Sequence, residues 1–228
     1  MQRREFLQQS GLLLGTAGLL PGVGLAASEL FPLTPDVPEE EARKLIWDAA
    51  YNRQWEAVKR WLERDPSLIG VVDLFDETLL HYAVRCGYNT GVEFLQCLVS
   101  YGADVNAKTD EGRTPLHYAA IRHYGGLRCN VEKIQYLVAQ GAEVNAKDVE
   151  GWTPLHFAAR RNHVDVLKCL ISAGADVWAK NDEGETPLDI ASRLLLVHED
   201  TEEEKRINRE RIRLAEEKKR ILREAMGL

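Results

Sequence analysis

A four-residue motif recurs along this chain. Thr114–His117 reads Thr-Pro-Leu-His, and Thr153–His156 repeats it letter for letter. Thr78–His81 lacks the proline, and Thr186–Asp189 ends in aspartate instead of histidine. The four copies begin 36, 39 and 33 residues apart. Self-similarity at a period in the thirties predicts stacked helical repeats, in which each unit buries its apolar face against its neighbours.

The recurring residues suit particular places in such a unit. Threonine is a favourable helix N-cap, and proline at the first helical position needs no hydrogen-bond donor. Asn106 and Asn145 favour turns, because asparagine side chains bond nearby backbone, whereas the third copy has Trp178 there. Glycines stand where a helix is expected to end in a left-handed turn, at Gly102, Gly141 and Gly174.

The motif and its glycines resemble the ankyrin repeat over about residues 42–197. This resemblance implies an all-α solenoid of stacked helix-turn-helix units with β-hairpin tips. Residues 41–199 are then the ankyrin-repeat domain, with a divergent N-terminal capping repeat, three full repeats and the start of a C-terminal cap. Residues 87–91 and 123–130 are surplus to the ankyrin period and are expected to be surface loops between helices.

The N-terminal residues differ from the repeats. Residues 1–27 begin with Arg3-Arg4, continue with a short apolar stretch and end in small residues. This order resembles a twin-arginine export signal of a bacterial precursor. Residues 28–40 hold three prolines and predict an extended linker.

The C-terminal residues depart from the ankyrin pattern. Residues 200–228 are highly charged, with Ile207, Leu214 and Ile221 recurring every seven residues and Leu222 beside them. We expect one long helix of about 25 residues, roughly 38 Å in length. Two interpretations stay open: an extended cap docked on the last repeat, or a helix that pairs with a partner or a second copy.

Charge and motif content exclude several classes of function. The net charge is -7, and residues 27–199 carry -9 of it, which argues against nucleic acid as the partner. The sequence contains no His/Cys spacing typical of zinc, no Gly-x-Ser-x-Gly and no phosphate-binding glycine loop. We therefore expect no enzyme activity, cofactor or metal. The ankyrin resemblance implies that His81, His117 and His156 are structural and tie one repeat to the next.

Candidate partner-binding residues follow from the resemblance by position. In the ankyrin family, the hairpin tips and the exposed positions of each first helix form the surface that partners contact. The corresponding tip residues are Leu74, Phe75, Glu77, Asp110, Glu111, Arg113, Val149, Glu150, Trp152, Asp182, Glu183 and Glu185. The corresponding helix residues are Arg85, Ile121, Arg122, Arg160 and Arg161. Exposed aromatic and arginine side chains are common binding anchors.

The four cysteines divide into two pairs. Cys97 and Cys169 occupy the same place in repeats two apart, too distant for a disulfide, and are expected to be core thiols. Cys86 and Cys129 lie in loops of successive repeats. In an oxidising compartment these two loops would allow a Cys86–Cys129 bridge, the alternative being two unpaired thiols.

These features together predict an exported ankyrin-repeat protein that binds an unidentified protein in the bacterial periplasm. It is expected to act as a monomer. The alternative is a membrane-tethered or self-associating envelope scaffold. It would use an uncleaved signal, or a dimer formed through the C-terminal helix.

Overall fold

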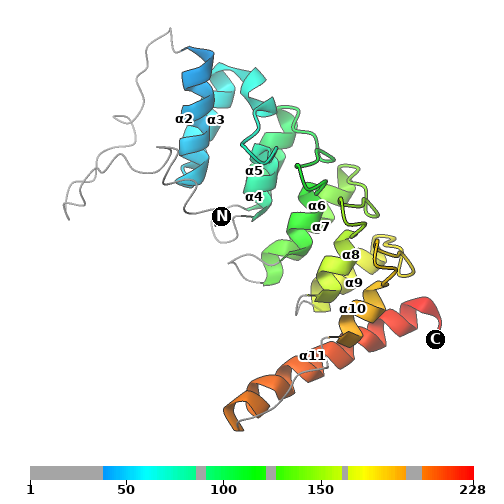
Figure 1. Ribbon diagram of the computed structural model, residues 1–228. Helices are drawn as coiled ribbons and strands as arrows, with labels where there is room; N and C mark the ends of the chain where they lie inside the picture. Colours follow the sequence, from blue (N-terminus) through cyan, green and yellow to red (C-terminus); the bar gives the residue numbers. More distant parts are fainter. Residues whose placement is uncertain (1–37, 86–90, 122–126, 161–163, 194–201) are drawn as a thin grey trace. The chain divides into compact units, whose positions relative to one another are not determined.

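A computed structural model describes residues 38–85, 91–121, 127–160, 164–193 and 202–228, with side chains except at 127–130 and 202–212. In these ranges the regular structure is helical (Figure 1). None of the described helices is both long enough and apolar enough to cross a membrane.

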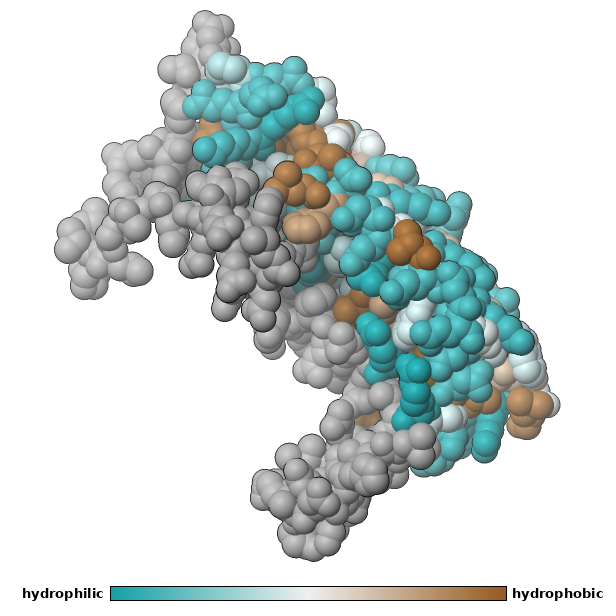
Figure 2. All heavy atoms as spheres, in the orientation of Figure 1, coloured by the Kyte–Doolittle hydropathy of each residue, from teal (hydrophilic) through white to brown (hydrophobic). Residues whose placement is uncertain are grey.

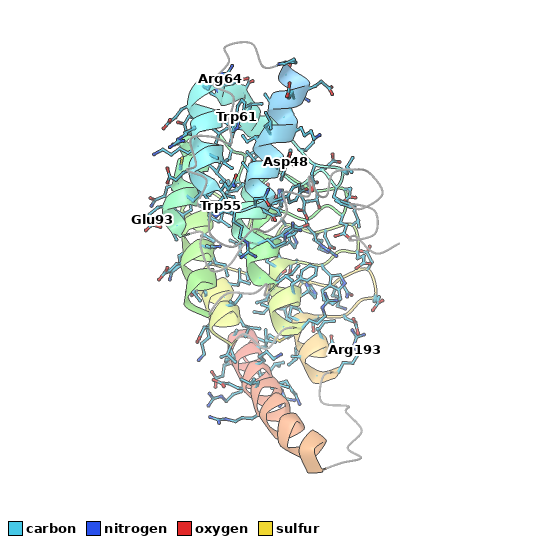
Figure 3. The ribbon with its side chains drawn as sticks, turned by 90° about the vertical axis from the view of Figure 1, so that its left-hand side faces the viewer. Asp48, Trp55, Trp61, Arg64, Glu93 and Arg193 are labelled. Atoms are coloured by element: carbon cyan, nitrogen blue, oxygen red, sulfur yellow. The ribbon has the colours of Figure 1, made fainter. Side chains whose placement is uncertain are left out.

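The helices form two rows (Figure 3). The first helices of successive repeats are α2 (Glu39–Tyr51), α4 (Leu79–Arg85), α6 (Pro115–Ala120), α8 (Pro154–Arg160) and α10 (Pro187–Arg193). The second helices are α3 (Trp55–Arg64), α5 (Val92–Ser100), α7 (Leu127–Ala139), α9 (Val164–Ser172) and α11 (Glu202–Met226). A short 3-10 helix, η1 (Pro66–Gly70), follows α3. Each first helix packs on the next first helix, and α5, α7, α9 and α11 follow one another likewise.

The recurring motif starts and stops the helices as its chemistry predicts. Thr114 and His117 form a reciprocal capping box at the start of α6, with Pro115 in the first turn. The expected left-handed ends are confirmed by φ angles of 93° at Gly102, 87° at Gly141 and 90° at Gly174. Local sequence therefore fixes where each helix begins and ends.

The N-terminal capping repeat begins slightly earlier than expected. Helix α2 starts at Glu39, so the last two residues assigned to the linker are helical. Its apolar stripe is buried at Ala42, Ile46 and Ala49, and Val58 and Leu62 of α3 are buried as well. The exposed Glu41 and Lys44 lie on the opposite side of α2, and Glu39 and Arg43 form an exposed i,i+4 ion pair near its N-terminus. The capping repeat thus has one buried and one solvated face.

The tips between repeats are hydrogen-bonded turns, and the described residues contain no β-strand. One isolated antiparallel bridge joins Val72 to Thr78. Each turn contains a short-range backbone bond, such as Asp76 N to Asp73 O at 3.2 Å, and is closed by a further backbone bond, such as Asp73 N to Glu77 O at 3.0 Å. The equivalent bonds are Thr109 to Arg113 (3.0 Å), Asp148 to Trp152 (2.9 Å) and Asn181 to Glu185 (3.1 Å). The expected β-hairpins are too short here to build paired strands.

The C-terminal helix α11 takes the place of the second helix in the last repeat. It packs on α10 and α9, and Ala215, Lys218 and Leu222 are buried. Of the expected apolar stripe, Leu222 is buried, Leu214 and Ile221 are half-buried, and the Ile207 side chain lies outside the described residues. Figure 3 shows α11 continuing the row of second helices.

Two buried lysines show that α11 is equivalent to an ordinary second helix. Lys133 of α7 donates from Nζ to the carbonyls of Ala83 (3.2 Å) and Val84 (3.1 Å) in the last turn of α4. Lys218 of α11 donates to the Ala159 carbonyl at 2.7 Å, in the last turn of α8. Each lysine thus reaches the first helix of the preceding repeat. A cation at a helix C-terminus is stabilised by the partial negative charge of the terminal carbonyls.

Candidate partner-binding surface

The tips rest on histidines that bridge successive repeats. His117 is fully buried, and its Nδ1 accepts the Thr114 backbone N–H at 3.0 Å. Its Nε2–H therefore donates to the Trp152 carbonyl of the next repeat, at 3.0 Å. Equivalent bonds join His81 to the Arg113 carbonyl (3.0 Å) and His156 to the Glu185 carbonyl (3.1 Å). The structural role expected for these three histidines is confirmed.

Burial keeps these imidazoles neutral. It lowers the pKa of His81 and of His117 from 6.5 to about 4, although bonds to backbone carbonyls partly oppose the shift. It also lowers the pKa of His156. In the fourth copy Asp189 replaces histidine, and its carboxylate accepts from the Thr186 N–H at 2.8 Å and hydroxyl at 2.7 Å. Those two bonds lower the pKa of Asp189.

The motif asparagines also join repeats. Asn106 was expected to bond its own turn, but its Nδ2 donates to the Gly141 carbonyl at 3.0 Å and its Oδ1 accepts the Glu143 N–H at 2.8 Å. Asn145 makes the same pair of bonds to Gly174 and Asp176, at 3.2 and 2.7 Å. The local prediction was wrong because stacking brings the helix end of the next repeat within hydrogen-bonding distance of both asparagine side chains. Trp178, at the third such place, is 52% exposed.

Backbone bonds between neighbouring tips hold the tips in a row, here named the tip row. Asp110 N donates to Phe75 O at 3.1 Å, and two further bonds continue the row: Val149 to Glu111 and Asp182 to Glu150, both at 3.0 Å. Leu74 is 63% exposed and Val149 is 65% exposed. Phe75 is half-buried, whereas the carboxylate residues of the row are exposed: Asp110, Glu111, Glu150, Asp182 and Glu183. Figure 2 shows a mainly hydrophilic surface with small, separate hydrophobic patches.

Three predicted surface residues are buried instead. Glu77 is 1% exposed, and Ile121 and Trp152 are each 7% exposed. The expectation that these side chains face a partner directly is therefore wrong. In three repeats the residue before the motif threonine contacts the residue eight positions later, as Glu77 contacts Arg85 and Trp152 contacts Arg160, so these side chains cover one another.

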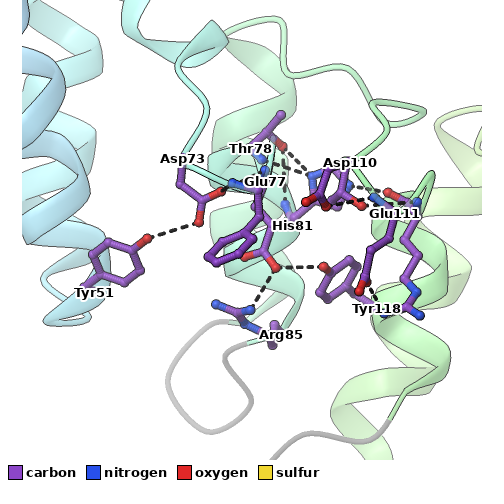
Figure 4. Close-up of polar contacts among 12 residues, drawn as sticks. Tyr51, Asp73, Glu77, Thr78, His81, Arg85, Asp110, Glu111 and Tyr118 are labelled. Atoms are coloured by element: carbon purple, nitrogen blue, oxygen red, sulfur yellow. Dashed lines mark hydrogen bonds and ion pairs between the residues drawn. The ribbon is translucent and has the colours of Figure 1, made fainter. Parts of the chain in front are cut away.

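Glu77 illustrates this pairing (Figure 4). Its Oε1 accepts from Arg85 Nη1 at 2.9 Å and from the hydroxyl of Tyr118, in the next repeat, at 2.7 Å. Arg85 also lies over the Tyr82 ring, 4.8 Å from the centroid. Arg85 is therefore held in place by a carboxylate beneath it and a ring beside it.

The same pair of positions is filled differently in the other repeats. Glu185 and Arg193 form an ion pair at 2.9 Å. Trp152 lies under the exposed Arg160, whose guanidinium carbon is 4.8 Å from the ring centroid. Arg113, in the second repeat, bonds Asp148 Oδ2 at 3.4 Å and also pairs with Glu111. Each repeat thus contributes one positioned arginine.

Sequence reasoning missed Arg193, Asp148 and Tyr118. Arg193 had a visible signal in the sequence. It stands eight residues after Glu185, and Arg85 likewise stands eight residues after Glu77. The Asp148 side chain is fully buried, and Tyr118 is 8% exposed. Their roles depend on the neighbouring repeat, so no signal within one repeat reveals them.

Several predicted residues lie outside the described part of the chain. These are Arg122, Arg161 and Cys86, together with the side chain of Cys129, so the proposed Cys86–Cys129 bridge stays a prediction. Cys97 and Cys169 are free thiols that are half-buried rather than fully in the core. Partial burial raises the pKa of both thiols. Among the described residues, no group of three or more His, Cys, Asp or Glu side chains is placed to hold a metal ion.

Comparison with known proteins gives the family. The sequence profile described as ankyrin repeats (3 copies) matches residues 46–148 and 127–201. The serine/threonine-protein kinase VIK of Arabidopsis thaliana is 36% identical over 86 residues, which is 36% of this chain and 19% of the kinase. Rabankyrin-5 of Homo sapiens is 45% identical over 49 residues, 22% of this chain and 4% of that protein. The chain thus spans less than a fifth of either relative, and the profile match across most of its length shows that it belongs to the ankyrin-repeat family.

Proposed function

We propose that this protein is exported, is not an enzyme, and binds another protein in the bacterial periplasm. The binding surface comprises the tip row and the exposed side of the first helices, here named the first-helix face. Ankyrin repeats imply a protein-interaction role. The observation that carries the proposal is the tip row itself. It presents Leu74 and Val149, 63% and 65% exposed, on turns that backbone bonds join into one array. A preorganised array with exposed apolar side chains suits a protein partner, since little conformational entropy is lost on binding.

Site-specific photocrosslinking in intact cells tests this assignment. A photoreactive phenylalanine analogue is placed at Leu74 or Val149, and at Gln96 or Gln135 as controls. The controls are exposed residues of the second helices α5 and α7. We expect one discrete crosslinked species from the two tip positions and none from the controls. Adducts of equal yield from all four positions would contradict a tip-centred binding site.

Export is tested separately, through the pair Arg3 and Arg4. Replacement of both by lysine keeps the charge and is expected to leave the precursor unexported, whereas the wild-type protein is expected in the periplasmic fraction. N-terminal sequencing of the exported protein then distinguishes a cleaved signal from a tether. A retained signal, or a dimer by light scattering, would favour the envelope scaffold. Unchanged export of the double-lysine variant would refute the twin-arginine assignment.

A further inference from the structure

Among the described residues, each repeat that carries the motif places an arginine on the side of the first helices. Arg85, Arg160 and Arg193 are the last residues of α4, α8 and α10. Arg113 is the residue directly before its motif threonine. In the other three repeats this place holds Glu77, Trp152 or Glu185, and each of these contacts the arginine of its own repeat. Because the first helices pack side by side at about 8–10 Å, these four arginines follow one another along successive repeats. We name Arg85, Arg113, Arg160 and Arg193 the arginine row.

In three of the four places the cation lies outside its carboxylate. The Arg85 side chain is 15% exposed and that of Glu77 is 1% exposed. The same order holds for Arg113 over Asp148, at 24% and 0%, and for Arg193 over Glu185, at 56% and 22%. At Arg85 and Arg193 a molecule approaching this face therefore meets the guanidinium group before its carboxylate, despite the negative net charge of the chain. At Arg113 it also meets Glu111, whose side chain is 53% exposed.

One aromatic ring contacts two of these arginines. The guanidinium carbons of Arg113 and Arg160 lie 5.1 and 5.3 Å from the centroid of the same ring, that of Phe157. The two carbons are consequently no more than about 10 Å apart. Stacking engages the face of a guanidinium, whereas carboxylates are bound by its in-plane N–H groups. Arginines already held in one rotamer lose less entropy when they bind.

We infer that the arginine row binds an extended acidic segment of a protein partner, with carboxylates about three residues apart. In a polyproline-II conformation every third side chain lies on the same side, about 9 Å further along, which matches the spacing of the first helices. The exposed carboxylates of the tip row repel an acidic segment that strays from the arginines, and so limit its placement. This inference rests on the proposed function, because it assumes that the first-helix face binds protein.

The probe is a fluorescein-labelled peptide of four Glu-Pro-Ala triplets, measured by fluorescence anisotropy against the purified protein. Matched peptides carry glutamine or lysine in place of glutamate. We expect the glutamate peptide to bind most tightly and to lose affinity as salt is raised. Substituting both Arg160→Gln and Arg193→Gln, whose side chains are exposed, is expected to weaken binding at least about tenfold.

The matched control is the double variant Lys59→Gln and Arg60→Gln, which removes two exposed cations from α3. Its affinity is expected to stay within about twofold of wild type. Circular dichroism establishes that both double variants are folded. Equal loss of affinity in the two variants would overturn the inference, as would equal binding of the glutamate and glutamine peptides.

The remaining outcomes separate this inference from the proposed function. Tightest binding by the lysine peptide would overturn the inference and assign ligand binding to the acidic tip row. If tip crosslinks form in cells but the glutamate peptide does not bind, the acidic segment is refuted and the tip row keeps its role. If the glutamate peptide binds and tip crosslinks are absent, the arginine row binds without the tips.

Discussion

Replacing His117 by glutamine tests whether the histidines join the repeats only while they are neutral. In the native protein Nδ1 accepts the Thr114 N–H and Nε2–H donates to the Trp152 carbonyl, both at 3.0 Å. Glutamine three residues after an N-cap threonine is the usual capping-box partner, so the start of α6 should survive. The bond to the next repeat is expected to be lost. At neutral pH, leaving the buried carbonyl without its donor should cost about 1–3 kcal/mol.

The sign of the pH dependence follows from the direction of the pKa shift. The pKa of His117 is about 4 in the folded protein, against 6.5 for an unperturbed histidine. Between these values the unfolded chain binds more protons, so stability falls as the pH falls through this window. Each unit corresponds to about 1.4 kcal/mol, so this site loses up to about 3 kcal/mol by pH 4. The glutamine variant has no such loss, and its deficit should shrink toward zero by about pH 5.

Urea unfolding followed by circular dichroism, at several pH values from about 7 to about 5, measures this convergence. Asn106→Ala is the matched control. It removes side-chain bonds to the Gly141 carbonyl and the Glu143 N–H of the next repeat, but has no titratable group. Its deficit should be the same at every pH. If the His117→Gln deficit also stays constant over this range, the proposed coupling between protonation and repeat stacking is refuted.

Four further substitutions probe backbone strain and the docking of α11. Gly151→Ala places Cβ 2.5 Å from Asp182 Oδ1 at a φ of 74°, whereas Gly184→Ala, at φ 77°, meets nothing within 4 Å. Thermal melts should show that Gly184→Ala lowers the free energy of unfolding by about 1–2 kcal/mol and that Gly151→Ala lowers it further. Equal losses in the two variants would refute the contact with Asp182. Asp76 has φ 54° at the equivalent place in the first tip, so Asp76→Gly should leave stability unchanged or raise it by up to about 1 kcal/mol, and a marked loss would contradict strain there. Burial lowers the pKa of Lys218 from 10.5 to about 8, so wild-type stability should rise between those pH values, and Lys218→Met should flatten that rise in urea titrations.

The candidate surface was predictable in place but not in detail. Counting from each motif threonine located the tips, and Leu74 and Val149 are exposed there as expected. The same counting put Glu77 and Trp152 on the surface, where they are buried. Whether a tip residue faces solvent depends on what stands eight residues later and in the next repeat. Position within one repeat does not contain that information.

Features that depend on local backbone chemistry can be read directly from the sequence. Thr114 caps α6 and Gly141 ends α7, because a cap needs a side-chain acceptor and a left-handed turn needs the conformational freedom of glycine. The tertiary structure alone decided the contacts between repeats. It turned Asn106 toward Gly141, and it buried Lys218 against α8 so that a highly charged helix completes the last repeat. Such contacts arise only when helices about 30 to 60 residues apart in the chain stack at about 10 Å, a separation that no local pattern encodes.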